Sequence, residues 1–125
     1  MMKKQTFLYA IALLMLASTA CKRENDNNPA LHGKWQGVEW LASGKSLGQD
    51  ASQVQFEFQT DGNYSAGFGA QQESGTWRTV KEKLYTKATG KQEIVVRILQ
   101  LDDNTLKFEM NRGGRQETIE LKKIQ

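Results

Sequence analysis

The chain has 125 residues, 25% of them charged, and 17 lysines and arginines against 14 aspartates and glutamates give a formal net charge of +3. The basic residues are scattered and alternate with glutamate, so there is no cluster that could follow phosphates, and we expect no nucleic-acid partner. The single histidine excludes a histidine-based metal cluster, and we expect neither a metal nor another cofactor.

Residues 1–20 have the pattern of an export signal. Lys3 and Lys4 precede an apolar run over residues 7–16, which is followed by the small residues 17–20. A run of this length is only half of the ~20 residues that a membrane-spanning helix needs. Without the two signal lysines the basic count falls from 17 to 15 against 14 acidic residues, so the net charge falls to about +1.

The residues around the only cysteine resemble a bacterial lipobox. Thr19 and Ala20 match that pattern before Cys21, whereas Ser18 stands where a leucine is usual. The resemblance implies that cleavage leaves Cys21 as the new N-terminus and that it receives a diacylglycerol, which anchors the protein to a membrane. The alternative is an ordinary signal peptide cut near Ala20, with a stray thiol, but acylation explains the odd cysteine.

The resemblance also implies a place in the cell envelope. Lipoproteins with Asp directly after the cysteine stay in the inner membrane of many Gram-negative bacteria, and this chain has Lys22 there. We therefore expect the outer membrane, with the periplasmic face and the cell surface both left open.

Residues 22–29 are polar and end in the chain's only proline, Pro29. Such a stretch buries too little apolar surface to offset the entropy of ordering it. We predict that residues 21–30 comprise the lipidated cysteine and a flexible tether, and that residues 31–125 form one domain.

The domain's hydrophobic pattern alternates with a period of two, which indicates β-strands. Val54–Phe58 and Leu106–Met110 are the clearest examples, and Asp61-Gly62 is a strong hairpin turn signal. Ile94–Leu101 is more continuously apolar and switches phase, which predicts a bulge. The predicted strands are Lys34–Leu41, Gln53–Gln59, Tyr64–Phe68, Gly75–Thr79, Lys83–Thr86, Gln92–Leu101, Thr105–Met110 and Gln116–Lys122.

These strands predict an all-β fold, an antiparallel up-and-down meander of about eight strands that closes into a small barrel. An open sandwich is the alternative architecture. The longest connection is Ala42–Ser52, rich in glycine and serine.

A set of short motifs resembles the lipocalin and fatty-acid-binding superfamily, and above all the short lipocalin-like domains of bacterial envelope lipoproteins. The similarity covers residues 31–124 and rests on the motifs Gly33-x-Trp35, Phe56-x-Phe58, Asp61-Gly62-x-Tyr64, Gly75-x-Trp77 and Leu106-x-Phe108. It implies that Trp35 closes the barrel floor beneath an arginine of the last strand, for which Arg115 is the nearest candidate. The chain is shorter than full-length lipocalins and lacks their Thr-Asp-Tyr turn motif, which argues against a deep calyx.

The sequence offers little for catalysis, and we expect no enzyme. Glu57, Glu109 and Glu120 fall on the polar phase of their strands, and Arg97 is expected to point outward. His32, beside the floor, is expected to make only a local hydrogen bond.

Aromatic side chains are the remaining candidates for a site. They fill the core in one interpretation and line a pocket for a small apolar or amphipathic ligand in the other, and both can hold if the upper barrel is open. The candidate lining residues are Trp40, Phe56, Phe58, Tyr64, Phe68, Trp77 and Phe108. We therefore predict a lipid-anchored module that binds a small hydrophobic ligand. The alternative is a scaffold that contacts another envelope protein through its surface or through the 42–52 loop.

Overall fold

The computed structural model describes residues 23–48 and 50–125. The predicted signal, residues 1–20, and the predicted lipidation site, Cys21, lie outside the described residues. Within the described part, no helix is long and apolar enough to cross a membrane.

The described chain is almost entirely β-structure, as predicted. Two short 3-10 turns, η1 (Pro29–Leu31) and η2 (Ala51–Gln53), are the only helical elements in these ranges. The eight predicted strands are all present, with ends shifted by a few residues. They are β1 (Gly33–Ala42), β3 (Val54–Phe58), β4 (Asn63–Phe68), β5 (Gln71–Val80), β6 (Lys83–Ala88), β7 (Ile94–Leu101), β8 (Thr105–Arg112) and β9 (Arg115–Lys123), and β2 (Lys45–Ser46) is an additional short strand in the 42–52 loop.

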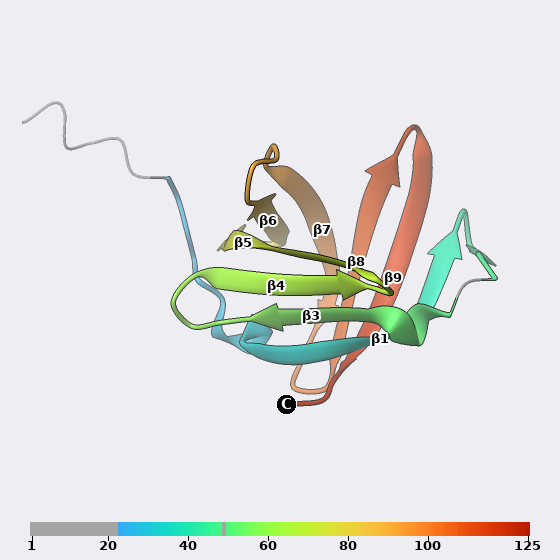
Figure 1. Ribbon diagram of the computed structural model, residues 1–125, viewed down its shortest axis with the longest axis horizontal. Coiled ribbons are helices and arrows are strands. Elements are labelled where there is room, and N and C mark those ends of the chain that lie inside the picture. The colour runs from blue at the N-terminus through green and yellow to red at the C-terminus, as the bar shows by residue number, and fades with distance from the viewer. Residues whose placement is uncertain (1–22, 49) are drawn as a thin grey trace, which may run out of the picture.

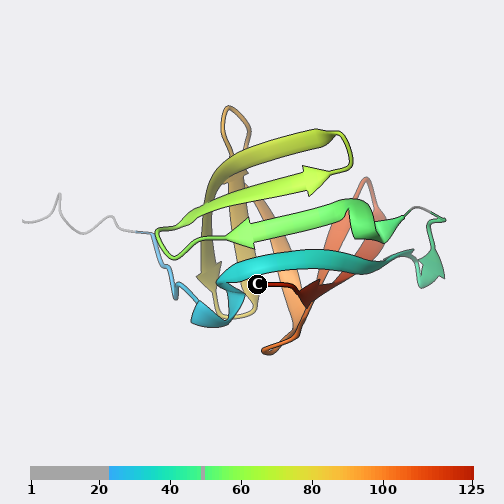
Figure 2. The ribbon, with the colours of Figure 1, turned by 60° about the horizontal axis from the view of Figure 1, so that its bottom comes forward.

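The strands form one antiparallel sheet that closes on itself. Its order is β2-β1-β3-β4-β5-β6-β7-β8-β9, and β1 also pairs with β9 from Trp35 opposite Lys123 to Ala42 opposite Glu117. The strands β1, β3 and β4 run side by side, and β8 and β9 cross them steeply (Figures 1 and 2). The predicted barrel is therefore confirmed, and the open sandwich is excluded.

The bulge predicted in Ile94–Leu101 is confirmed. The register between β7 and β8 shifts between Ile98 and Gln100, so Leu99 has no partner on β8. This extra residue reverses the alternation, so that Val96 and Ile98 before it and Leu101 after it all face the core.

The turn η2 covers the place where β1 and β3 separate. These strands pair only from Gly33 to Gln36 of β1, and beyond that point η2 packs against β1. A Cβ at Gly37 would lie 2.0 Å from the backbone oxygen of Ala51, so the close approach requires glycine at this position.

The core lies inside the barrel, and η1 plugs its floor. Leu31 and Trp35 are fully buried, and the Trp35 indole nitrogen donates a hydrogen bond to the Leu31 carbonyl oxygen at 2.9 Å. All the buried core residues fall between Leu31 and Leu121, within one closed sheet. The described residues thus hold one closed sheet with its buried core, and we expect residues 23–125 to fold independently.

Lys123, not Arg115, is the cation over Trp35. The Lys123 ammonium nitrogen lies 5.4 Å from the centre of the Trp35 ring, and the two residues are direct partners across β1 and β9. Arg115 begins β9 at the opposite end of the strand, where it faces Arg112. The role implied for Arg115 is therefore wrong, because β9 runs antiparallel to β1, so that the end of β9 and not its beginning lies beside Trp35 at the floor.

The segment before η1 is bound to the outside of the barrel. The Asp26 amide donates to the Thr79 carbonyl oxygen at 2.7 Å, and Arg23 forms an ion pair with Glu93 at 3.0 Å. The described part of the predicted tether, residues 23–30, thus makes specific contacts with the barrel, and its flexibility stays a prediction. Its polar side chains find partners on β5 and beside β7, and composition alone does not reveal such partners.

Candidate functional site

The end of the barrel opposite η1 contains an apolar cavity of about 470 Å³. This volume lies within the range of pockets that hold small molecules. The walls come from eight of the nine strands, all except β2, and among the residues that line it are Trp40, Phe56, Phe68, Leu84, Thr86, Ile94, Phe108, Met110 and Ile119. The upper barrel is therefore open while the lower barrel is filled.

The seven predicted lining residues divide between these two parts. Trp40, Phe56, Phe68 and Phe108 line the cavity. The other three, Phe58, Tyr64 and Trp77, are buried in the core next to it, with the Phe58 and Trp77 rings 5.6 Å apart in a T-shaped arrangement. Phe56 links the parts, since it stacks on Phe58 and meets Phe68 and Phe108 edge-on.

One polar pair joins the core to the cavity wall. The Tyr64 hydroxyl donates a hydrogen bond of 2.6 Å to a carboxylate oxygen of Glu73, which lines the cavity. Burial, together with the neighbouring Glu73 carboxylate, raises the pKa of Tyr64 well above its ordinary value. The hydroxyl therefore remains a donor, and Glu73 keeps a second oxygen for a ligand.

A buried carboxylate lies at the rim of the cavity. Glu117 is fully buried, and its Oε1 accepts a hydrogen bond of 2.7 Å from the Trp40 indole nitrogen. Arg112 and Arg115, both more than half exposed, approach its two oxygens at 3.5 and 3.7 Å. Within the described residues, its Oε2 has no hydrogen-bond partner. Two cations thus share one carboxylate at the open end.

Sequence reasoning missed Glu117, although a signal was present. Glu117, Ile119 and Leu121 occupy alternate positions of β9 and all three point inward. A carboxylate on the apolar phase of a strand is unusual enough to mark a special position.

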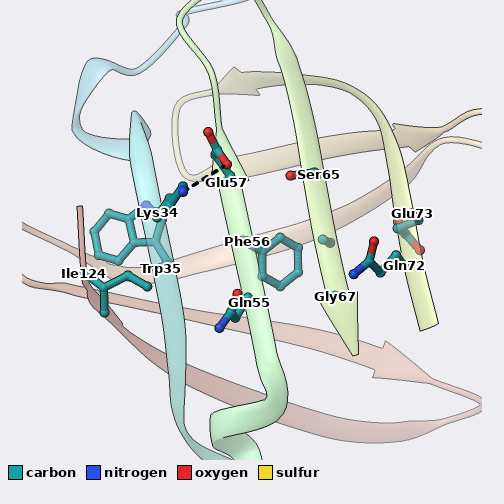
Figure 3. Close-up of a pocket in the computed structure, with 11 residues that line it drawn as sticks. Lys34, Trp35, Gln55, Phe56, Glu57, Ser65, Gly67, Gln72, Glu73 and Ile124 are labelled. Atoms are coloured by element: carbon teal, nitrogen blue, oxygen red, sulfur yellow. Dashed lines mark ion pairs between the residues drawn. The ribbon is translucent and has the colours of Figure 1, made fainter. Parts of the chain in front are cut away.

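The outer surface has a separate and smaller hollow of about 190 Å³ across β1, β3, β4 and β5 (Figure 3). Outward polar side chains such as Gln55, Glu57 and Gln72 line it, and Lys34 pairs with Glu57 at 4.0 Å. Trp35, Phe56 and Ile124 also line it (Figure 3), but this hollow is smaller and more polar than the barrel cavity, so we take the barrel cavity as the site.

The other residues singled out from the sequence lie outside the cavity. His32 meets the Trp77 ring edge-on and its Nε2 lies 3.4 Å from the Asn27 side-chain oxygen. Arg97 is exposed, as expected, whereas Glu57, Glu109 and Glu120 are half-buried on the outer face. In residues 23–48 and 50–125, no three His, Cys, Asp or Glu side chains come together as a metal site would require.

A closed up-and-down antiparallel barrel with an apolar cavity at one end is the architecture of lipocalin-type binding proteins. The family described as "Lipocalin-like domain" matches residues 31–108, and the chain belongs to this family.

Two solved structures from Bacteroides share the fold. An uncharacterized protein from Bacteroides eggerthii is 15% identical, with a TM-score of 0.59 over 74% of this chain and 98% of that one. A lipocalin-like protein from Bacteroides uniformis is also 15% identical, with a TM-score of 0.55 over 72% of this chain and 96% of that one. No curated protein matches the chain.

Proposed function

We propose that this protein is a lipid-anchored lipoprotein of the cell envelope whose barrel binds a small apolar or amphipathic molecule. The observation that carries the binding role is the cavity of about 470 Å³ beneath the open end of the barrel. Its apolar rings supply the binding energy, and the carboxylate of Glu73, which lines the cavity, accepts a hydrogen bond from a polar group of the ligand.

Filling the cavity tests this role. Thr86 is buried on β6 and lines the cavity. The residue before it, Tyr85, lies on the opposite face of the strand and points outward beneath Arg78. In residues 23–125, Thr86→Trp is expected to abolish the fluorescence gain of N-phenyl-1-naphthylamine, an apolar dye, and Tyr85→Trp to leave it unchanged. Equal binding by both variants would contradict the proposal, provided that circular dichroism shows both folded.

The anchor requires its own test, because it rests on residues 17–21 of the sequence alone. Mass spectrometry of the N-terminal peptide from the native host is expected to find acyl chains on Cys21. Cys21→Ser is expected to release the protein from the membrane fraction, and Thr19→Ser, a matched change in the same motif, is expected to leave it there. An unmodified cysteine in membrane-free protein would refute the anchor while leaving the binding role intact.

A second function, contact with another envelope protein, is supported by the hairpin that β2 forms with the end of β1. The hairpin stands away from the barrel wall (Figure 1), and β2 is the edge strand of the sheet, with Lys45 exposed. A crosslinker attached through Lys45 is expected to capture one specific envelope protein if the hairpin is an interaction site. Lys91, exposed in the β6–β7 loop, provides the control position.

A further inference from the structure

The barrel wall is split at its open end between β7 and β8. Their pairing begins only at Arg97 opposite Glu109. Residues 94–96 of β7 therefore pair only with β6, and residues 110–112 of β8 pair only with β9. The two strands lie together near their turn and diverge toward the other end (Figure 1).

This split differs from the one between β1 and β3. There η2 packs into the gap, and the backbone of Ala51 approaches Gly37 too closely for any side chain. Between β7 and β8 no described element covers the diverging ends.

A further hollow, here called the outer hollow and distinct from the one in Figure 3, lies on the outer side of the split. Its volume is about 440 Å³, and it includes charged residues of β7 and β8 and of the adjoining β5–β6 turn and β6. Val95, Val96, Met110 and Asn111 line both this hollow and the barrel cavity. The same four residues therefore form the border between the apolar interior and the outer surface.

The two hollows differ in chemistry. The cavity is walled mainly by apolar side chains, whereas the outer hollow carries Lys83 and Arg97 together with Glu82 and Glu109. Two charges of each sign favour a polar group without net charge, such as a zwitterion, because a strongly charged group would meet repulsion from one pair.

We propose that the split is a lateral opening for an elongated amphipathic ligand, whose apolar chain lies in the barrel cavity and whose zwitterionic or neutral polar group lies in the outer hollow. This inference rests on the proposed binding function and specifies its ligand class. An amphiphile placed in this way buries its chain without desolvating its polar group, which would otherwise cost free energy.

Two tryptophan variants on β7 test the opening. Val95 is 52% exposed at the split, and Leu99 is 42% exposed at the bulge of the same strand, where the residues on either side of it pair with β8. Val95→Trp is expected to fill the outer hollow, whereas Leu99→Trp adds the same ring away from it. Val95→Tyr, a smaller intrusion, replaces the first variant if that protein does not fold.

The measurements use residues 23–125 and two probes. N-phenyl-1-naphthylamine is apolar and reports the cavity, while dodecylphosphocholine, kept below its micelle concentration, displaces it and carries a zwitterionic group on a single chain. Because Val95 also borders the barrel cavity, the dye affinity of Val95→Trp is measured first, and displacement by dodecylphosphocholine is expected to weaken about tenfold more than dye binding does, equivalent to 1.4 kcal/mol. An equal loss for both probes would place the effect in the barrel cavity and refute the opening. Leu99→Trp is expected to match the unaltered protein with both probes.

Each other outcome counts against the lateral opening. If Val95→Trp binds both probes as the unaltered protein does, the opening is refuted while the binding function stands. If Val95→Trp and Leu99→Trp weaken displacement equally, the effect does not come from the split and the inference fails. If the unaltered protein binds neither probe, both the inference and the proposed function fail.

Discussion

Removing both arginines at the rim is expected to expose the energetic cost of burying Glu117. This carboxylate is 0% exposed, whereas the side chains of Arg112 and Arg115 are 59% and 57% exposed. Alanine at both positions leaves the charge with the Trp40 indole as its only remaining polar contact among the described residues.

The magnitude follows from this asymmetry. Removing one arginine leaves the other in place, and since each pair is half in water, each single substitution is expected to cost about 1 kcal/mol. Removing both leaves a buried charge without a counterion, which costs about 3–5 kcal/mol. The double variant is therefore expected to lose more than the sum of the two single variants.

Chemical unfolding of residues 23–125 in urea, followed by circular dichroism, measures these differences. The midpoint is expected to fall with an unchanged slope, since the surface exposed on unfolding stays the same. In thermal unfolding, each 1 kcal/mol corresponds to about 4–8 °C for a domain of this size. Arg97→Ala, which removes an exposed arginine outside this cluster, is the matched control and is expected to change little.

If the double variant loses only as much free energy of unfolding as the two single variants together, within about 0.5 kcal/mol, the two arginines do not share one buried charge and the prediction is wrong. That result would mean that each arginine acts independently as a surface charge and that Glu117 is compensated by other means.

Two further predictions concern the wall and the N-terminal segment. Gly37→Ala is expected to lower the free energy of unfolding by at least about 2 kcal/mol, because the new methyl group would overlap the carbonyl oxygen of Ala51 in η2. Gly67→Ala is the control, since its methyl group enters open space, and its free energy of unfolding is expected to stay within about 0.5 kcal/mol of that of the unaltered protein. Urea unfolding measures both. A hydrogen bond from the Arg78 guanidinium holds the pKa of Glu93 below its usual range, so stability from this contact is present above the ordinary glutamate pKa and is lost as the pH falls through the lowered value. Hydrogen exchange is accordingly expected to show that the amide of Asp26 loses protection at acidic pH. Glu93→Gln is expected to remove that pH dependence. If the loss of protection had its midpoint at the ordinary glutamate pKa, the lowered pKa of Glu93 would not be its cause and the prediction would be wrong.

The sequence predicts the fold well because local patterns determine it. Alternation in Val54–Phe58 fixes which face of the strand is buried, and Asp61-Gly62 fixes the turn that follows. The phase switch in Ile94–Leu101 locates a bulge. These features depend on neighbours in the chain, so a single sequence reveals them.

The site is less predictable because it depends on strands that are far apart in the chain. Trp40 and Glu117 meet only because β1 closes the barrel against β9. The cavity exists because the rings of Phe58 and Trp77 fill the lower part of the barrel while Phe56 and Phe108 line a space above them, which depends on barrel dimensions rather than on residue type. The N-terminal segment likewise finds Thr79 from more than fifty residues away.

The contact between Arg23 and Glu93 limits how far the barrel can travel from a membrane. With an acyl group on Cys21, only Lys22 separates the anchored residue from one that is held on the barrel, and two residue steps reach about 7 Å. The domain would then rest close to the bilayer with the side that carries β5 and β6 turned toward it. An anchored protein held in this way would exchange a bound ligand with what lies in or on its own membrane rather than carry it across the envelope.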